Sequence, residues 1–230
     1  MTPLLVLMFG FAPATAVGTD LLFASLTKTV GSGVHGFRGT VDWRIVRRLA
    51  SGSLPGAVMT LLALNSLGKP GPVTQTVITT VLGIMLILTA VAIVFRTRII
   101  LWATRTFGTR DTNYRGSATI ILGVLLGIFV SISSVGAGAI GVTALIILYP
   151  GMPVARIVGS DIAHAVPLTL IAGLGHWLIG TVDLTLLASL LVGSVPAVIV
   201  GSLIGSRAPD RILRPMLAVV LLAVGIKLLS

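Results

Sequence analysis

The 230-residue chain contains no cysteine and no glutamate. Without cysteine, it has no disulfide bonds and no thiol redox chemistry. It also lacks the G-x-S-x-G and H-E-x-x-H motifs, and its three histidines do not form a metal-ligand cluster. These absences argue against an enzyme, and no pattern indicates a cofactor or a metal site.

Charged residues are scarce as well, at 10% of the chain, whereas hydrophobic residues reach 55%. In soluble domains about a quarter of the residues are charged. Long apolar runs alternate with short polar clusters, at 76–95, 117–131, 184–204 and 212–229. Each run is about as long as a helix that crosses a ~30 Å hydrocarbon layer. The sequence therefore predicts an all-α, polytopic membrane protein with one integral membrane domain.

The formal net charge of +10 comes from arginines that gather in polar segments between these runs. The clusters are Arg38, Arg44, Arg47 and Arg48; Arg96, Arg98, Arg105, Arg110 and Arg115; and Arg207, Arg211 and Arg214. Such segments are typical of cytoplasmic loops under the positive-inside rule. The charge is thus explained by multi-pass insertion into the cell inner membrane, without a nucleic-acid partner.

The chain aligns with itself, without a gap, at a shift of 141 residues. Asp20 then falls on Asp161, and His35 falls on His176. Glycines and a proline coincide too, which shared hydrophobicity alone does not produce. We predict a tandem duplication, with a first repeat at 1–95, a basic cytoplasmic loop at 96–116 and a second repeat at 117–230.

The basic clusters indicate how the two copies are oriented. A segment rich in arginine in one copy is nearly neutral in the other, at two places. This pattern favours inverted repeats, each with a short broken element such as the apolar segment 142–149 and its glycine-rich lead-in. If that segment is instead a re-entrant loop, the copies are parallel.

The first repeat has no counterpart of the helix predicted at 117–134 or of the loop at 135–141. We therefore expect about 25 or more further residues upstream, enough for one span and a loop.

An aspartate recurs at the same place in both copies. His164 follows Asp161 by three residues, which places both on one helix face. An Asp–His pair of this kind can carry a proton. The structural alternative is that Thr19 and Ser160 cap helix starts, with Asp20 and Asp161 in the first turn. We favour proton coupling or substrate contact for Asp161 and His164, and for Asp20 the two interpretations are even.

Lys28 lies within an apolar stretch and matches Thr169 in the second copy. If it faces inward, it is the natural counter-charge for an anionic substrate, and snorkelling to the interface is the alternative. Gly136 to Gly141 fits the dinucleotide pattern G-x-G-x-x-G but has no βαβ context. An anion site at a half-helix start and close helix packing are equally good interpretations. The predicted substrate-binding residues are Lys28, Thr19, Ser160, Gly136 and Gly138.

His35 and His176 precede Gly-Thr-Val-Asp in both copies. Capping of backbone carbonyls is the favoured interpretation, and a proton relay is the alternative. Asp42 and Asp183 are expected to cap the helices that follow them.

Three stretches carry a family resemblance. "TPLLVLMFGFAPATAVGTDLL", "HGFRGTVDWRIVRRLASGSLPGA" and "GAGAIGVTALIILYPGMPVARIVGSDIAHAVPLTLIAGLGHWLIGTVD" resemble the TauE/SafE sulfite exporters, over nearly the whole chain. The resemblance implies movement of sulfur-containing oxyanions or organic anions, such as sulfite, sulfonates or sulfoacetate, driven by an ion gradient. Many members have serine in place of Asp20 and Asp161, which implies a subgroup with its own coupling or substrate.

The leading hypothesis is a secondary transporter of small anions that is coupled to protons. Its partners would be the lipid bilayer, the anion and the proton. The alternatives are a passive anion channel and a non-transporting membrane scaffold or assembly protein.

Overall fold

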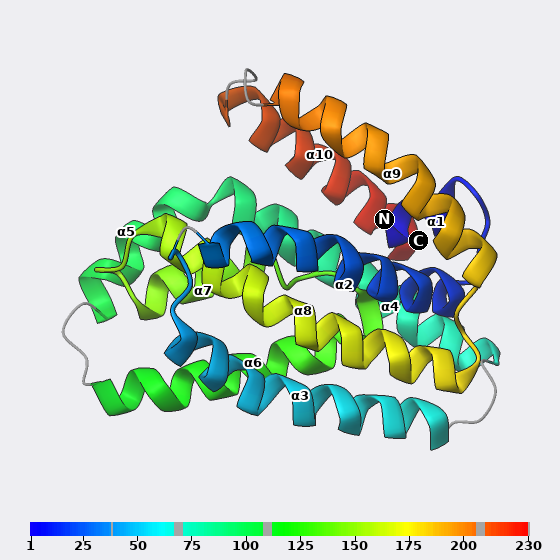
Figure 1. Cartoon of the computed structure of the whole chain (residues 1–230), viewed down its shortest axis with the longest axis horizontal. Helices are drawn as coiled ribbons and strands as arrows, with labels where there is room; N and C mark the ends of the chain where they lie inside the picture. The colour runs from blue at the N-terminus through cyan, green and yellow to red at the C-terminus, as the bar shows by residue number, and fades with distance from the viewer. Residues whose placement is uncertain (38, 67–70, 108–111, 206–209, 230) are drawn as a thin grey trace.

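The structure is a computed structural model that describes residues 1–37, 39–66, 71–107, 112–205 and 210–229, and all its regular elements there are helices (Figure 1). The helices are α1 (Thr2–Leu7), α2 (Pro13–Phe37), α3 (Trp43–Ser66), α4 (Pro72–Val94), α5 (Arg96–Phe107), α6 (Thr112–Ser133), α7 (Ala139–Leu148), α8 (Val154–Ile179), α9 (Leu184–Gly205) and α10 (Asp210–Leu229).

Three described segments have the length and composition of membrane spans: α4, residues Arg115–Ser133 of α6, and α8. Shorter apolar segments lie in α9, at Leu184–Ser194, and in α10, at Pro215–Leu229. Large apolar side chains also face outward along the helices; Leu178, for example, is 88% exposed. An outward apolar surface of this kind suits hydrocarbon rather than water. The prediction of a helical protein that crosses the membrane several times is confirmed.

Helices α2 and α8 run antiparallel through the middle of the molecule (Figure 1). Near one end of the pair, Gly18 of α2 lies against His176 and the carbonyl of Thr181. Near the other end, Gly159 of α8 lies against the carbonyl of Thr40. The largest buried apolar cluster takes Val17, Leu21, Ala165, Leu168 and Ala172 from these two helices. The α2–α8 pair therefore forms the centre of the helix bundle.

Helices α3 and α6 pack through glycines, with their backbones in close contact. A Cβ atom on Gly56 would lie 2.9 Å from the carbonyl oxygen of Val124. Gly52, Gly123 and Gly127 likewise face backbone atoms of the opposite helix. Gly52 and Gly56 on α3, like Gly123 and Gly127 on α6, form the G-x-x-x-G spacing that allows close approach of membrane helices.

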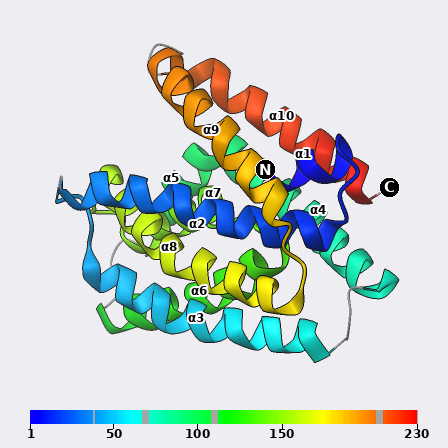
Figure 2. The same ribbon diagram turned by 45° about the vertical axis from the view of Figure 1, so that its right-hand side comes forward.

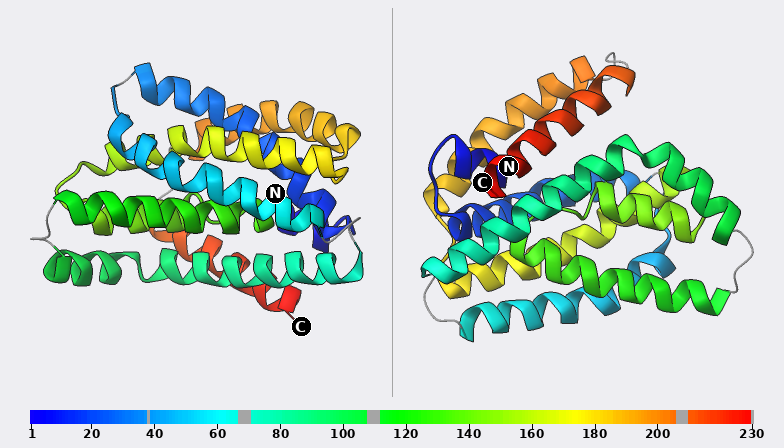
Figure 3. Two further views of the ribbon diagram at one scale, coloured as in Figure 1. Left: turned by 90° about the horizontal axis from the view of Figure 1, so that it is seen from below. Right: turned by 180° about the vertical axis from the view of Figure 1, so that it is seen from behind.

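Helices α9 and α10 leave the rest of the bundle at an angle, as Figures 1 and 2 show. Helix α10 returns to pack on α4, where Gly83 and Gly225 face each other's carbonyl oxygens. The view from behind in Figure 3 shows α9 and α10 above the layer that contains α4.

Two sequence expectations about local structure are wrong. The segment 96–116, predicted as a loop, contains α5, and α6 begins within it at Thr112. Thr19 and Ser160 do not stand at helix starts, because α2 begins at Pro13 and α8 begins directly after Pro153. Proline is a preferred residue at a helix start, and the apolar residues that follow continue the helix. The segment predicted as a short broken element forms most of the ten-residue helix α7.

Candidate functional site

Asp161 and His164 lie on the buried face of α8, with exposures of 2% and 0%. Asp161 Oδ1 and His164 Nδ1 are buried atoms for which the described part of the chain supplies no hydrogen-bond partner. The other ring nitrogen, His164 Nε2, lies 2.7 Å from the hydroxyl of Ser53 on α3. A buried polar atom without a partner is unfavourable by about 1–3 kcal/mol. Two such atoms one helical turn apart leave room in the hydrogen-bond network for a proton, a water or a polar ligand.

The Asp161 carboxylate lies against the first turn of α7. A Cβ atom on Gly141 would be 2.5 Å from Asp161 Oδ1. Only glycine therefore allows α7 to pass this close to the carboxylate. The start of a helix carries partial positive charge, which favours a carboxylate beside it. The glycine-rich start of α7 and the buried Asp161 are thus in direct contact.

Lys28 of α2 is half-buried. Its charge interacts more strongly with Asp161 than with Asp20. It lies eight residues after Asp20, about 12 Å further along α2. Because α2 and α8 are antiparallel, this places Lys28 between the levels of the two aspartates. Lys28 is therefore within electrostatic range of both buried acids, and no ion pair joins it to either one among the described residues.

Asp20 has a different environment from Asp161. Its Oδ2 atom accepts hydrogen bonds from the backbone nitrogen of Thr2 at 2.9 Å, the hydroxyl of Thr2 at 2.7 Å and the hydroxyl of Ser134 at 3.1 Å. The amino group of Met1 lies 3.0 Å from the same oxygen. Asp20 therefore complements the start of α1 rather than that of its own helix. This environment favours the structural role for Asp20.

The hydroxyls of Thr19 and Ser160 already have partners. Thr19 Oγ1 accepts from the backbone nitrogen of Asp183 at 3.1 Å. Ser160 Oγ accepts from the backbone nitrogen of Asp42 at 2.8 Å. The first bond connects α2 to the segment before α9, and the second connects α8 to the segment before α3.

The capping prediction for Asp42 and Asp183 is confirmed. Asp42 Oδ1 accepts from the backbone nitrogen of Arg44 at 3.0 Å. Asp183 Oδ1 accepts from the backbone nitrogen of Thr185 at 2.9 Å.

His176 is buried at 1% exposure, with partners on both ring nitrogens. Nε2 lies 2.8 Å from the carbonyl oxygen of Ser131, and Nδ1 lies 2.9 Å from the hydroxyl of Thr181. It thus ties α8 to α6, as expected of a histidine that binds backbone carbonyls. The side chain of His35 lies outside the described residues.

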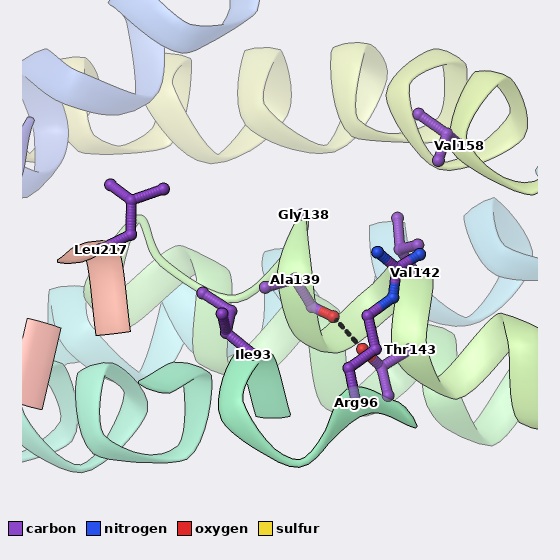
Figure 4. A pocket seen from close by; sticks show the side chains of 8 residues that line it. All are labelled: Ile93, Arg96, Gly138, Ala139, Val142, Thr143, Val158 and Leu217. Atoms are coloured by element: carbon purple, nitrogen blue, oxygen red, sulfur yellow. Dashed lines mark hydrogen bonds between the residues drawn. The ribbon is translucent and has the colours of Figure 1, made fainter. Parts of the chain in front are cut away.

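The two predicted substrate glycines have different surroundings. Gly136 has a φ of +112°, and a Cβ there would lie 2.6 Å from the methyl group of Met85, which fits close packing. Gly138 is the N-cap of α7 without a side-chain cap, and it borders a cavity of about 220 Å³ (Figure 4). The cavity is lined by Ile93, Arg96, Gly138, Ala139, Val142, Thr143, Val158 and Leu217. Of the two glycines, only Gly138 lines this space.

Arg96 is a cavity residue that the sequence analysis did not select. In Figure 4 its side chain reaches toward Val142 of α7. It is the only charged residue among the described residues that line this cavity. Its position directly after the apolar run of α4 was the available signal. The lining includes Val158, one turn before Asp161 on α8, and Gly138, one turn before Gly141 on α7, but not Asp161 itself.

No group of three or more histidine, aspartate or glutamate side chains able to hold a metal ion occurs in the described ranges.

Comparisons with known proteins identify the family of the chain. Residues 1–228 match the family described as sulfite exporter TauE/SafE. A relative from Bacillus subtilis (strain 168), called probable membrane transporter protein YjnA, is 35% identical over 234 residues, covering 100% of this chain and 90% of the relative. No solved structure matches the chain with statistical significance. The chain therefore belongs to the TauE/SafE family of membrane transporters.

Proposed function

We propose that this transporter moves small sulfur-containing oxyanions or organosulfonates, such as sulfite or a sulfoacetate-like anion, across the inner membrane with a proton. The observation that carries this proposal is the buried Asp161 and His164 pair, whose Oδ1 and Nδ1 atoms lack partners, beside the start of α7. Ionisable groups inside a membrane protein are costly unless they serve a pathway or a ligand.

Two cations match the charge of the substrate. Lys28 supplies an amine from α2, and Arg96 supplies a guanidinium at the neighbouring cavity. A planar guanidinium suits a carboxylate or a sulfur oxyanion because it can donate two parallel hydrogen bonds. The uncapped start of α7 at Gly138 adds partial positive charge.

Coupling to protons follows from competition for Lys28. Without substrate, the Lys28 charge stabilises the Asp161 carboxylate. An anion that binds Lys28 takes over this charge, and the carboxylate is then best stabilised by a proton. One proton would accompany one bound anion. In this proposal the role of Thr19, Ser160 and His176 is mainly structural. Their polar atoms already form hydrogen bonds with other segments of the chain.

Movement would use two inverted repeats. The order of one short and three long helices is the same in α1–α4 and α7–α10. Thr19 binds Asp183 in the second half, and the matching Ser160 binds Asp42 in the first half. Gly18 and Gly159 likewise face the carbonyls of Thr181 and Thr40. Such reciprocal contacts support a two-fold relation through the α2–α8 pair, on which alternating access about a midplane site can operate.

The test is uptake of radiolabelled sulfite and sulfoacetate into liposomes that contain the purified protein, with and without a pH gradient. Wild type, Asp161→Asn, Lys28→Gln and Lys28→Arg are compared. We expect gradient-driven uptake that Asp161→Asn uncouples, that Lys28→Gln abolishes and that Lys28→Arg partly restores. Wild-type flux that ignores the gradient would indicate a channel, and absence of flux in folded protein would contradict transport of these anions.

A further inference from the structure

A second cavity, of about 270 Å³, lies apart from the Asp161 site, where α7 ends and α8 begins. It is lined by Arg115, Tyr149, Gly151, Met152, Pro153 and Arg156. Two of these six residues are arginines, and none of the six is acidic. Neither arginine takes part in the transport mechanism proposed above.

A chain of hydroxyls holds a third arginine next to the cavity. The Thr119 hydroxyl donates to the carbonyl of Arg115 at 2.6 Å, so it accepts from the Tyr149 hydroxyl, which lies 2.8 Å away. The Tyr149 oxygen in turn lies 3.5 Å from Arg48 Nη1. The tyrosine is thereby fixed with its acceptor side toward Arg48.

The positive charge around this cavity is only partly compensated. Arg156 has one acidic neighbour, Asp42, at 3.7 Å. No ion pair involves Arg48 or Arg115 within the ranges that the structure describes. Arg115 Nε is buried and finds no acceptor among the described residues. A buried donor without an acceptor indicates a missing partner, and a guanidinium is best satisfied by an oxyanion.

The cavity also lies at the ends of two membrane segments. Arg115 is the first residue of the span Arg115–Ser133, and Arg156 is the third residue of α8. Pro153, the N-cap of α8, provides no side-chain cap, so the first backbone N–H groups of this helix add to the positive field. Basic pockets at the ends of membrane helices are suited to phosphate headgroups.

We propose that Arg115 and Arg156, with Arg48 behind Tyr149, form a binding site for a phosphate group. The phosphate belongs either to an anionic phospholipid of the adjacent leaflet or to a free phosphate ion. In both cases, two phosphate oxygens would lie between the guanidinium groups and supply the acceptor that Arg115 lacks. The site is independent of substrate transport.

The first experiment measures binding to the full chain in detergent. Native mass spectrometry and thermal unfolding are carried out with phosphatidylglycerol, with phosphatidylcholine and with inorganic phosphate. The variants are Arg115→Gln and Arg156→Gln. The matched control is Arg98→Gln, because Arg98 lies over the Phe95 ring at 6.0 Å and lines neither cavity.

We expect wild type and the control to retain phosphatidylglycerol and to unfold at a higher temperature with it than with phosphatidylcholine. Each glutamine variant should weaken this binding about tenfold, which is within the range for charged hydrogen bonds. A second outcome is that inorganic phosphate raises the unfolding temperature as much as phosphatidylglycerol does, with the effect lost in the same variants. That result would identify the bound phosphate as the free ion. Binding that is equal in wild type and both variants, or no binding of either phosphate, would overturn the site.

A second measurement does not depend on how the arginine variants fold. Since the chain has no cysteine, Met152→Cys places a single thiol at the cavity. Phosphatidylglycerol or phosphate should slow its reaction with a water-soluble thiol reagent, whereas phosphatidylcholine should not. Equal reaction rates in all three conditions would contradict the proposal.

Discussion

The imidazole of His164 and the hydroxyl of Ser53 lie 2.7 Å apart and join α8 to α3 inside the protein. This contact is the one hydrogen bond of the His164 side chain within the described residues, because Nδ1 has no partner there. Ser53 in turn lies where α3 touches Gly127 of α6. The ring is thus oriented by a helix that packs closely against a third helix.

Ser53→Ala should leave both ring nitrogens of His164 without a protein partner. We expect a loss of about 1–3 kcal/mol in the free energy of unfolding, as for other buried polar groups that lose a partner. Chemical unfolding in detergent measures this loss. Ser51→Ala is the matched control, since the Ser51 hydroxyl is exposed and bonds only to the carbonyl of Arg48 among the described residues. Equal stabilities of the two variants would contradict a structural role for the Ser53 contact.

Gly141→Ala should impair transport more than stability. The added methyl group would meet Asp161 Oδ1 at 2.5 Å, so the carboxylate must turn away from α7. We expect at least tenfold slower gradient-driven uptake in liposomes. Gly193→Ala in α9 is the control, because a Cβ atom there meets nothing within 4 Å. If both variants transport like wild type, the Asp161–Gly141 contact does not contribute to transport.

Gly127→Val should separate α3 from α6. Its Cβ atom would already lie 2.9 Å from Ser53 Cα, and two further methyl groups leave no room for the helix contact. We expect a loss of about 3 kcal/mol in the free energy of unfolding, at the upper end of overpacking effects. Thermal and chemical unfolding in detergent test this, again with a Gly193 variant, Gly193→Val, as the control. A Gly127 variant as stable as its control would show that the α3–α6 contact adjusts.

Arg96→Gln should raise the KM for a transported anion about tenfold and leave kcat less affected, because it removes a charged hydrogen-bond donor from the cavity beside α7. Arg98→Gln removes the same charge two residues away and serves as the comparison. Arg96→Lys should restore only part of the affinity, since an amine cannot form the bidentate contact. Equal KM values in the two glutamine variants would assign the effect to net charge rather than to the cavity.

The membrane class of this protein could be predicted from the sequence. Few charges, long apolar runs and arginines between them predicted a multi-pass membrane protein, because the bilayer restricts both the length and the composition of its spans. The apolar segment 142–149 is too short to span alone and predicted a broken element together with its glycine-rich lead-in, and the structure has the short helix α7 at this place. Asp161 and His164 were also selected correctly as residues on one helix face.

Other features required the tertiary structure. Periodicity does not show which face of a membrane helix points inward, because lipid-facing and protein-facing surfaces are both apolar. The sequence therefore left proton coupling open for Asp20 as well as for Asp161, whereas the structure surrounds Asp20 with donors and leaves one oxygen of Asp161 without a partner among the described residues. Arg96 and the Arg115–Arg156 cavity depend on contacts between segments far apart in the chain. The sequence determined the membrane environment, the spans and the ionisable residues of this protein. The packing of its helices decided which of those residues lack hydrogen-bond partners.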